Sequence, residues 1–84
     1  MNNRQRKILS ALFAKKVPKS IPFRDIESLL TALGCEVIEG QGSRVFFQLG
    51  EIGLDLHRPH PGKEALEYQV KSIRLFLLKS GIEP

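Results

Sequence analysis

The sequence of 84 residues has no tryptophan and only one cysteine, one tyrosine and one methionine. A single thiol, Cys35, cannot form an intramolecular disulfide, and no cysteine–histidine cluster has the spacing of a zinc site. The sequence therefore predicts a protein of a reducing compartment with no structural metal and no cofactor. Cys35 follows a predicted helix end, and we expect its side chain to be buried rather than reactive.

Long apolar runs are also missing. No segment approaches the roughly 18–20 apolar residues of a membrane span. The apolar stretch 8–14 is short, is followed at once by Lys15 and Lys16, and has no small-residue cleavage site, so it differs from a signal peptide. We interpret it as part of a helix in a cytoplasmic protein. A chain of this length has no room for a deep cavity, which favours a polymer or a protein as its partner over a small metabolite.

Acidic residues are absent from residues 1–24, which hold seven basic side chains. Residues 25–84 hold six basic and nine acidic side chains, so the net charge of +4 is concentrated at the N-terminal end. This asymmetry suits an anionic partner, nucleic acid first and a membrane surface second. The alternative interpretation is a solvated helix face that keeps the protein soluble.

Apolar residues at helical spacing predict three helices, at about 5–16, from 22 or 23 to 33, and from 65 or 67 to 79. The apolar positions that define them are Ile8, Leu9, Leu12 and Phe13, then Ile26, Leu29, Leu30 and Leu33, and finally Leu66, Val70, Ile73 and Leu77. Strand character is expected at 35–39, 43–49 and 52–57. Prolines at 59 and 61 predict a rigid loop before the last helix.

The dipeptide Gly50-Glu51 predicts a two-residue hairpin turn between the last two strands. Leu49 then pairs with Ile52, and Arg44 lies directly across from His57. This register places the apolar residues of both strands on one face, whereas a slip of one residue would set them against polar residues. The other face is expected to be exposed and to carry Arg44, Phe46, Gln48, Asp55 and His57.

The predicted element order is α-α-β-β-β-α, an α+β fold. It has a three-stranded antiparallel sheet, with the helices on its apolar face and the other face in water.

His57 is the first candidate for acid–base chemistry, because an imidazole that titrates near neutrality can take or give a proton during RNA cleavage. Arg44 across the ladder is placed to hold a phosphate and stabilise its developing charge. Asp55 on the same face is a candidate for orienting the ring. His60, in the proline-flanked loop, is either a further catalytic group or a residue that fixes the turn.

Five further residues are candidates for binding RNA. Gly42 allows close backbone approach, Ser43 can donate to a phosphate, and Phe46 on the exposed face can stack on a base. Phe46 has two alternatives, an interface with a partner protein or burial beneath the N-terminal helix. Arg58 and Lys63 extend a possible phosphate track, together with Lys71, and solvated surface charge is the alternative for these three.

The chain resembles the HicA family of toxin–antitoxin toxins from about Phe23 to Ile82. The resemblance depends on the segment from Arg24 to Leu30, on Leu33-Gly34, on Gly42-Ser43 at the start of a strand, on residues 59–63 (Pro-His-Pro-Gly-Lys), and on the segment 79–82 (Lys-Ser-Gly-Ile). It implies a double-stranded-RNA-binding-domain-like α-β-β-β-α fold, here with an extra N-terminal helix. It also divides the chain into a basic helix and linker, 1–22, and a HicA-like domain, 23–84.

The resemblance implies a metal-independent endoribonuclease, an mRNA interferase, whose partners are mRNA and a HicB-like antitoxin. In that family the residue directly after Gly-Ser is typically a histidine, which is regarded as catalytic. This chain has Arg44 at that position. The resemblance therefore leaves His57, with Arg44 and His60, as the candidate catalytic group. Two alternatives stay open on the same fold, a nucleic-acid-binding module without catalysis and a domain that binds an acidic, antitoxin-like protein.

Overall fold

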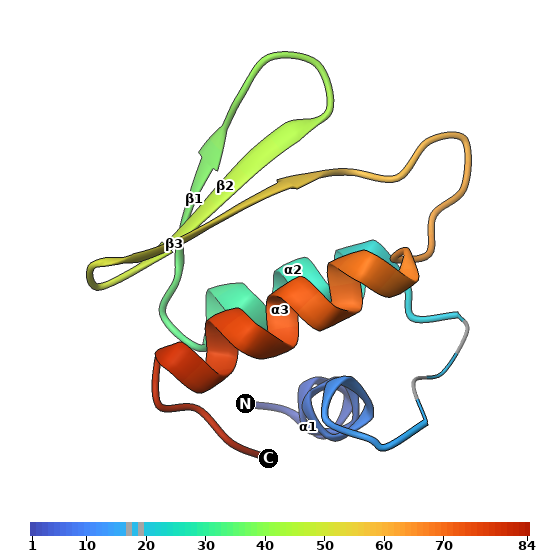
Figure 1. Ribbon diagram of the computed structural model, residues 1–84, viewed down its shortest axis with the longest axis vertical. Helices are drawn as coiled ribbons and strands as arrows, with labels where there is room; N and C mark the ends of the chain where they lie inside the picture. Colours follow the sequence, from blue (N-terminus) through green and yellow to red (C-terminus); the bar gives the residue numbers. More distant parts are fainter. Residues whose placement is uncertain (17, 19) are drawn as a thin grey trace.

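The computed structural model describes residues 1–16, 18 and 20–84 and has the predicted element order. The elements are α1 (Asn3–Leu12), α2 (Phe23–Ala32), β1 (Glu36–Glu39), β2 (Arg44–Leu49), β3 (Ile52–His57) and α3 (Glu67–Lys79). Figure 1 shows three layers, in which α2 and α3 lie between the sheet and α1. No helix in the described part of the chain is long and apolar enough to span a membrane.

The antiparallel sheet has the order β1-β2-β3, and its register is the predicted one. Leu49 pairs with Ile52 across the turn, where Gly50 has φ 60°, and Arg44 pairs with His57 at the other end of the ladder. Because side chains alternate along a strand, this register sends one set toward the helices and the other toward solvent. The α+β architecture and the exposed second sheet face are thus confirmed.

The core lies between the sheet and the helices and extends to the inner face of α1. Its fully buried members include Phe47 and Val45 from the sheet and Ile26, Leu29, Leu30, Ile73 and Leu77 from the two central helices. Cys35 is buried, as expected. The apolar repeat that defines the last helix includes Leu66, but Leu66 is the extended N-cap of α3 rather than part of its apolar face, and it is 51% exposed.

Helix α1 begins and ends earlier than the predicted range of about 5–16. It begins at Asn3 because Asn2 and Gln5 form a capping box, in which each side chain bonds the backbone N–H of the other. It ends at Leu12, and two i→i+3 backbone bonds close its last turn. The other predicted bounds agree with the observed ones to within two residues, and those of β3 are identical.

Polar contacts fasten α1 to the two central helices. The Arg4 guanidinium donates two hydrogen bonds to the Asp25 carboxylate on α2, at 3.1 and 3.0 Å. At the other end, Arg74 on α3 donates from Nε to the carbonyl of Leu12 at 2.6 Å and from Nη2 to that of Ala14 at 3.2 Å. Those carbonyls lie at the helix C-terminus, where they lack partners within the helix. Both ends of α1 are therefore held against the rest of the protein.

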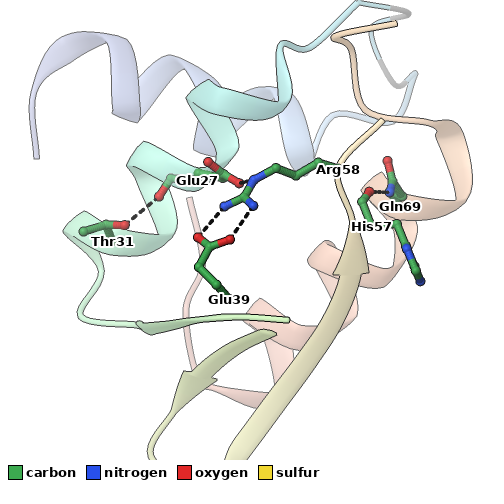
Figure 2. Close-up of polar contacts among 6 residues, drawn as sticks. All are labelled: Glu27, Thr31, Glu39, His57, Arg58 and Gln69. Carbon is green, nitrogen blue, oxygen red and sulfur yellow. Dashed lines mark hydrogen bonds and ion pairs between the residues drawn. The ribbon is translucent and has the colours of Figure 1, made fainter. Parts of the chain in front are cut away.

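Arg58, the first residue after β3, joins three parts of the chain (Figure 2). Its Nε donates to Glu27 Oε1 on α2 at 2.6 Å, and Nη1 and Nη2 donate to the two carboxylate oxygens of Glu39 on β1 at 2.6 and 2.8 Å. These hydrogen bonds, to Glu39 first and then Glu27, raise the pKa of Arg58, and they hold the pKa of Glu39 below its usual value. We call these three residues the Arg58 clamp; it fixes where the loop after β3 begins.

Substitution Leu12→Ala tests whether α1 folds as one unit with residues 23–84. Leu12 is fully buried, so its truncation leaves a cavity, and we expect the free energy of unfolding to fall by roughly 2–5 kcal/mol. Urea unfolding followed by circular dichroism measures this. The control Lys7→Ala removes an exposed side chain of the same helix and should change stability by less than about 0.5 kcal/mol. A loss in Leu12→Ala no larger than in the control would mean that α1 adds nothing to the stability of the domain.

The Arg58 clamp predicts a specific response to acid. Since the folded pKa of Glu39 is lowered, the stability it contributes is present above the unfolded pKa and is lost as the pH falls through the folded pKa. Thermal melts of the wild type should therefore lose more stability between about pH 6 and about pH 3 than melts of Glu39→Gln, which has no charge to lose. Glu36→Gln, on the same strand, removes a carboxylate with no ion pair to another described residue and should respond to acid like the wild type.

Candidate functional site

His57 is the last residue of β3, and its exposed side chain lies on the solvent face of the sheet across from Arg44. Its ring Nδ1 lies 3.3 Å from the hydroxyl of Ser43, which directly precedes β2. When Nδ1 carries the proton and donates to Ser43, Nε2 is unprotonated and can act as a base. When Ser43 donates to Nδ1, Nε2 carries the proton and can donate a hydrogen bond; the imidazolium, protonated on both nitrogens, is the form that can act as an acid. In both tautomers Nε2 is the nitrogen left for a substrate.

The backbone of His57 is held by Gln69, a residue that the sequence analysis missed. Gln69 is 1% exposed, and its Nε2 donates to the His57 carbonyl at 2.7 Å, as Figure 2 shows. Its Oε1 accepts from the backbone N–H of Leu66 at 3.0 Å, so both ends of the amide are satisfied. A glutamine at the third position of a helix is a known capping signal, so the bond to Leu66 was open to prediction. The bond to His57 depends on how α3 sits against β3.

Arg44 forms an ion pair on this face. Its Nη2 lies 2.6 Å from Asp55 Oδ2, and both side chains are about half exposed. The suggestion that Asp55 orients the His57 ring is therefore not supported, because the carboxylate binds Arg44 and the ring contact comes from Ser43. An exposed pair of this kind is worth little and can exchange with other ions.

Phe46 lies on the same face, between Ile38 of β1 and Asp55 of β3 in the register. Its ring lies over Gly53, because a Cβ added at Gly53 would clash with the Cζ of Phe46. Phe46 is half-buried in this position. It is not covered by α1, which lies on the far side of α2 and α3 from the sheet (Figure 1). Part of the ring is therefore open to a ligand or a partner protein.

Gly42 and Ser43 belong to the turn between β1 and β2. Gly42 has φ 61°, and a Cβ built there would meet nothing within 4 Å, so the surface is open. A depression of ≈ 240 Å³ lies beside this turn. It is lined by Ile38, Glu39, Gly40, Gln41, Arg44, Val45, Phe46 and Asp55.

The structure does not gather the remaining predicted residues at His57. Arg58 uses its guanidinium for Glu27 and Glu39, so we assign it to holding the loop rather than to binding phosphate. Lys63 is exposed at a second depression, of ≈ 420 Å³, and its carbonyl accepts from the N–H of Phe23 at 2.8 Å. His60 is exposed in the loop, and no hydrogen bond in the described part of the chain joins it to His57 or Arg44.

The predicted set therefore divides in two. Ser43, Arg44 and His57 lie together at one end of the β2–β3 ladder, on the sheet face that also carries Phe46. Among the described residues, no group of three or more His, Cys, Asp or Glu side chains is arranged to hold a metal ion. The cluster can offer an imidazole nitrogen, a guanidinium and a hydroxyl to an anionic ligand.

Comparison with known protein families identifies one that matches most of this chain. Residues 23–82 match the family described as HicA toxin of bacterial toxin–antitoxin. Comparison with curated proteins and with solved structures gave no match. The matched range begins at the first residue of α2, contains the whole sheet and α3, and leaves α1 outside it. The chain belongs to the HicA family of bacterial toxin–antitoxin toxins.

Proposed function

We propose that this HicA-family toxin is an endoribonuclease that cleaves mRNA without a metal ion and is neutralised by a HicB-like antitoxin. The observation that carries the proposal is the placement of His57, Arg44 and Ser43 together on an exposed face of the sheet. The protein has no deep cavity there, which suits a polymer that lies along the surface.

The proposed reaction begins with His57 Nε2, which accepts the proton of a ribose 2′-hydroxyl while Nδ1–H donates to Ser43. The 2′-oxygen attacks the adjacent phosphorus, and the bond from phosphorus to the 5′-oxygen of the next nucleotide breaks. The products are a 2′,3′-cyclic phosphate and a 5′-hydroxyl. A proton must reach the leaving 5′-oxygen, and His57, once protonated, or a water molecule can deliver it.

Arg44 is the proposed phosphate ligand. A guanidinium forms paired hydrogen bonds with phosphate and stabilises the charge that develops on its oxygens. Its present partner, Asp55, is half exposed, so a phosphate can replace that carboxylate at little cost. The open surface at Gly42 and the half-buried ring of Phe46 supply further contacts for the strand, to its backbone and to a base.

A second candidate is an RNA-binding toxin that does not cut. It is favoured by Arg44 in the position where the family typically has its histidine, and by the Asp55 carboxylate, which binds Arg44 rather than the His57 ring. In that case the same face would hold RNA through phosphate contacts, and affinity would fall steeply with salt.

The first experiment incubates the purified protein with a long unstructured RNA in excess EDTA. We expect the wild type to cleave the RNA and His57→Ala to be slower by about 10²–10⁴-fold, the scale of a lost acid–base group. Glu51→Ala, at the exposed turn of the same hairpin, is the matched control and should cleave like the wild type. Folding of each variant is checked by circular dichroism.

Equal cleavage by the wild type and His57→Ala would exclude His57 as the acid–base group. No cleavage by either protein, with both folded and bound to RNA, would favour the second candidate. In cells, arrest of growth by the wild type but not by His57→Ala is the corresponding expectation.

The Arg44–Asp55 ion pair gives an independent test of phosphate binding. Asp55→Asn removes the carboxylate that competes with phosphate, so we expect RNA affinity to rise about two- to fivefold, the scale of an exposed ion pair. Arg44→Ala should weaken RNA binding. Asp55→Asn should raise RNA affinity less in the Arg44→Ala protein than in the wild type. Fluorescence anisotropy with labelled RNA measures all four proteins. Equal gains in the two backgrounds would mean that Asp55 acts by general charge and not through Arg44.

A further inference from the structure

A third depression lies between the C-terminal end of α1 and the N-terminal half of α3. Its volume is ≈ 710 Å³, larger than the two described above. Four basic side chains and one acidic side chain line it, together with small apolar residues. The lining residues are Lys15, Lys16, Pro18, Ala65, Leu66, Glu67, Val70, Lys71 and Arg74, and we call this surface the α1–α3 groove.

Arg74 gives the α1–α3 groove a fixed wall. Its hydrogen bonds to the carbonyls of Leu12 and Ala14 hold the end of α1 against α3. Lys15 and Lys16 follow Ala14 directly, are exposed, and have no ion pair with another described residue. Two adjacent ammonium groups are thus kept beside α3 by a contact that uses neither of them.

Charge in the groove is less neutralised than at three arginines elsewhere in the protein. Arg4, Arg44 and Arg58 each bond a carboxylate at 3.0 Å or less. Lys71, on the opposite wall, has only Glu67 at 3.7 Å, and both side chains are more than two-thirds exposed, so this pair is weak. The groove therefore brings three ammonium groups, each unpaired or weakly paired among the described residues, to one depression.

The floor of the groove is apolar. Val70 is buried, whereas Leu66 is 51% exposed. Proteins bind single-stranded nucleic acid in positively charged grooves that follow the phosphate backbone, with side chains against which the bases lie. Here the lysines supply the charge, and Leu66 supplies the apolar surface.

The groove lies on the helix side of the molecule, and the start of α3 connects it to the backbone of His57 at the end of β3. Leu66 and Gln69 share a hydrogen bond at the start of α3, and Gln69 bonds the backbone of His57. Lys71 is two residues beyond Gln69, about 3 Å further along the helix axis. One strand of RNA can therefore touch both surfaces by passing around the first turns of α3.

We propose that the α1–α3 groove is a second binding site for single-stranded RNA, which holds the phosphate backbone away from the point of cleavage through Lys15, Lys16 and Lys71. The site rests on the proposed function, in that its ligand is the RNA substrate. It gives α1, which lies outside the matched family range, a role in substrate affinity. RNA long enough to occupy both surfaces binds more tightly than RNA that fits only one.

The test measures RNA affinity by anisotropy over a range of salt concentrations. The double variant Lys15→Gln/Lys16→Gln removes two groove charges, and Arg6→Gln/Lys7→Gln removes two exposed charges from the same helix outside the groove. If both lysines contact phosphate, the groove variant should bind roughly 10–30-fold more weakly at about 0.1 M salt, with a salt slope smaller by about 1.4. The control should lose less than about threefold and keep the slope of the wild type. Lys71→Gln removes one charge from the opposite wall of the groove. Its salt slope should fall by about half as much as that of the double variant.

Equal losses in the groove and control variants would overturn the proposal, because they would show general attraction by net charge. Unchanged affinity in the groove variant would overturn it as well. So would groove-dependent binding to vesicles of anionic lipid or to polyglutamate without an effect on RNA, since the occupant would then be a membrane or an acidic protein. Thermal melts must show that the variants are folded; the glutamines replace exposed side chains, so equal midpoints are expected.

Failure of the groove is distinguishable from failure of the cleavage proposal. His57→Ala lacks the acid–base group but keeps the groove, so adding Lys15→Gln/Lys16→Gln to it should still lower the salt slope by about 1.4, as in the wild type. If the wild type binds through the groove and cuts nothing, the cleavage proposal fails while the groove stands. If the wild type cuts RNA and the groove variant binds as tightly as the wild type, the groove fails while the cleavage proposal stands.

Discussion

The pairing register of β2 and β3 is the constraint on which both the core and the candidate site depend. The turn at Gly50 and Glu51 sets Leu49 against Ile52, and each later pair follows from that one. The same alternation buries Phe47 and Leu56 against the helices and brings Arg44 across from His57 on the other face. A slip by one residue would turn the buried apolar side chains toward solvent. It would also move Arg44 away from His57. Selection for a stable core therefore also maintains the geometry of the exposed face.

The arginines of this small protein differ in how firmly their neighbours hold each guanidinium. Arg58 lies between Glu27 and Glu39, which accept a hydrogen bond from each of its three nitrogens, so its release costs three charge-assisted hydrogen bonds. Arg44 has one half-exposed carboxylate, from which a phosphate can displace it. Arg74 bonds main-chain carbonyls and carries no competing acid among the described residues. Sequence position does not separate these three cases, whereas the partners of each guanidinium do.

The fold could be predicted from the sequence because its signals are local. Gly50 defines the turn, alternation defines the two long strands, and the spacing of three and then four residues from Val70 to Ile73 and Leu77 defines the last helix. The errors arise where a tertiary contact replaces a local rule. Leu66 fits the helical repeat but lies before the helix, and the buried position near the start of α3 belongs to Gln69, which bonds the distant carbonyl of His57.

Of the candidate site, the sequence could predict only those positions that follow from the strand register. Register placed Arg44 beside His57, whereas the partners of these residues depend on rotamers and on contacts between elements. Ser43 rather than Asp55 touches the imidazole, and Arg58 turns toward Glu27 and Glu39, residues 31 and 19 positions away. The N-terminal charge shows the same limit. Its excess is visible in the sequence, but only packing shows that Asp25 of α2 binds Arg4 while Lys15 and Lys16 are left beside α3, where a polyanion can reach them.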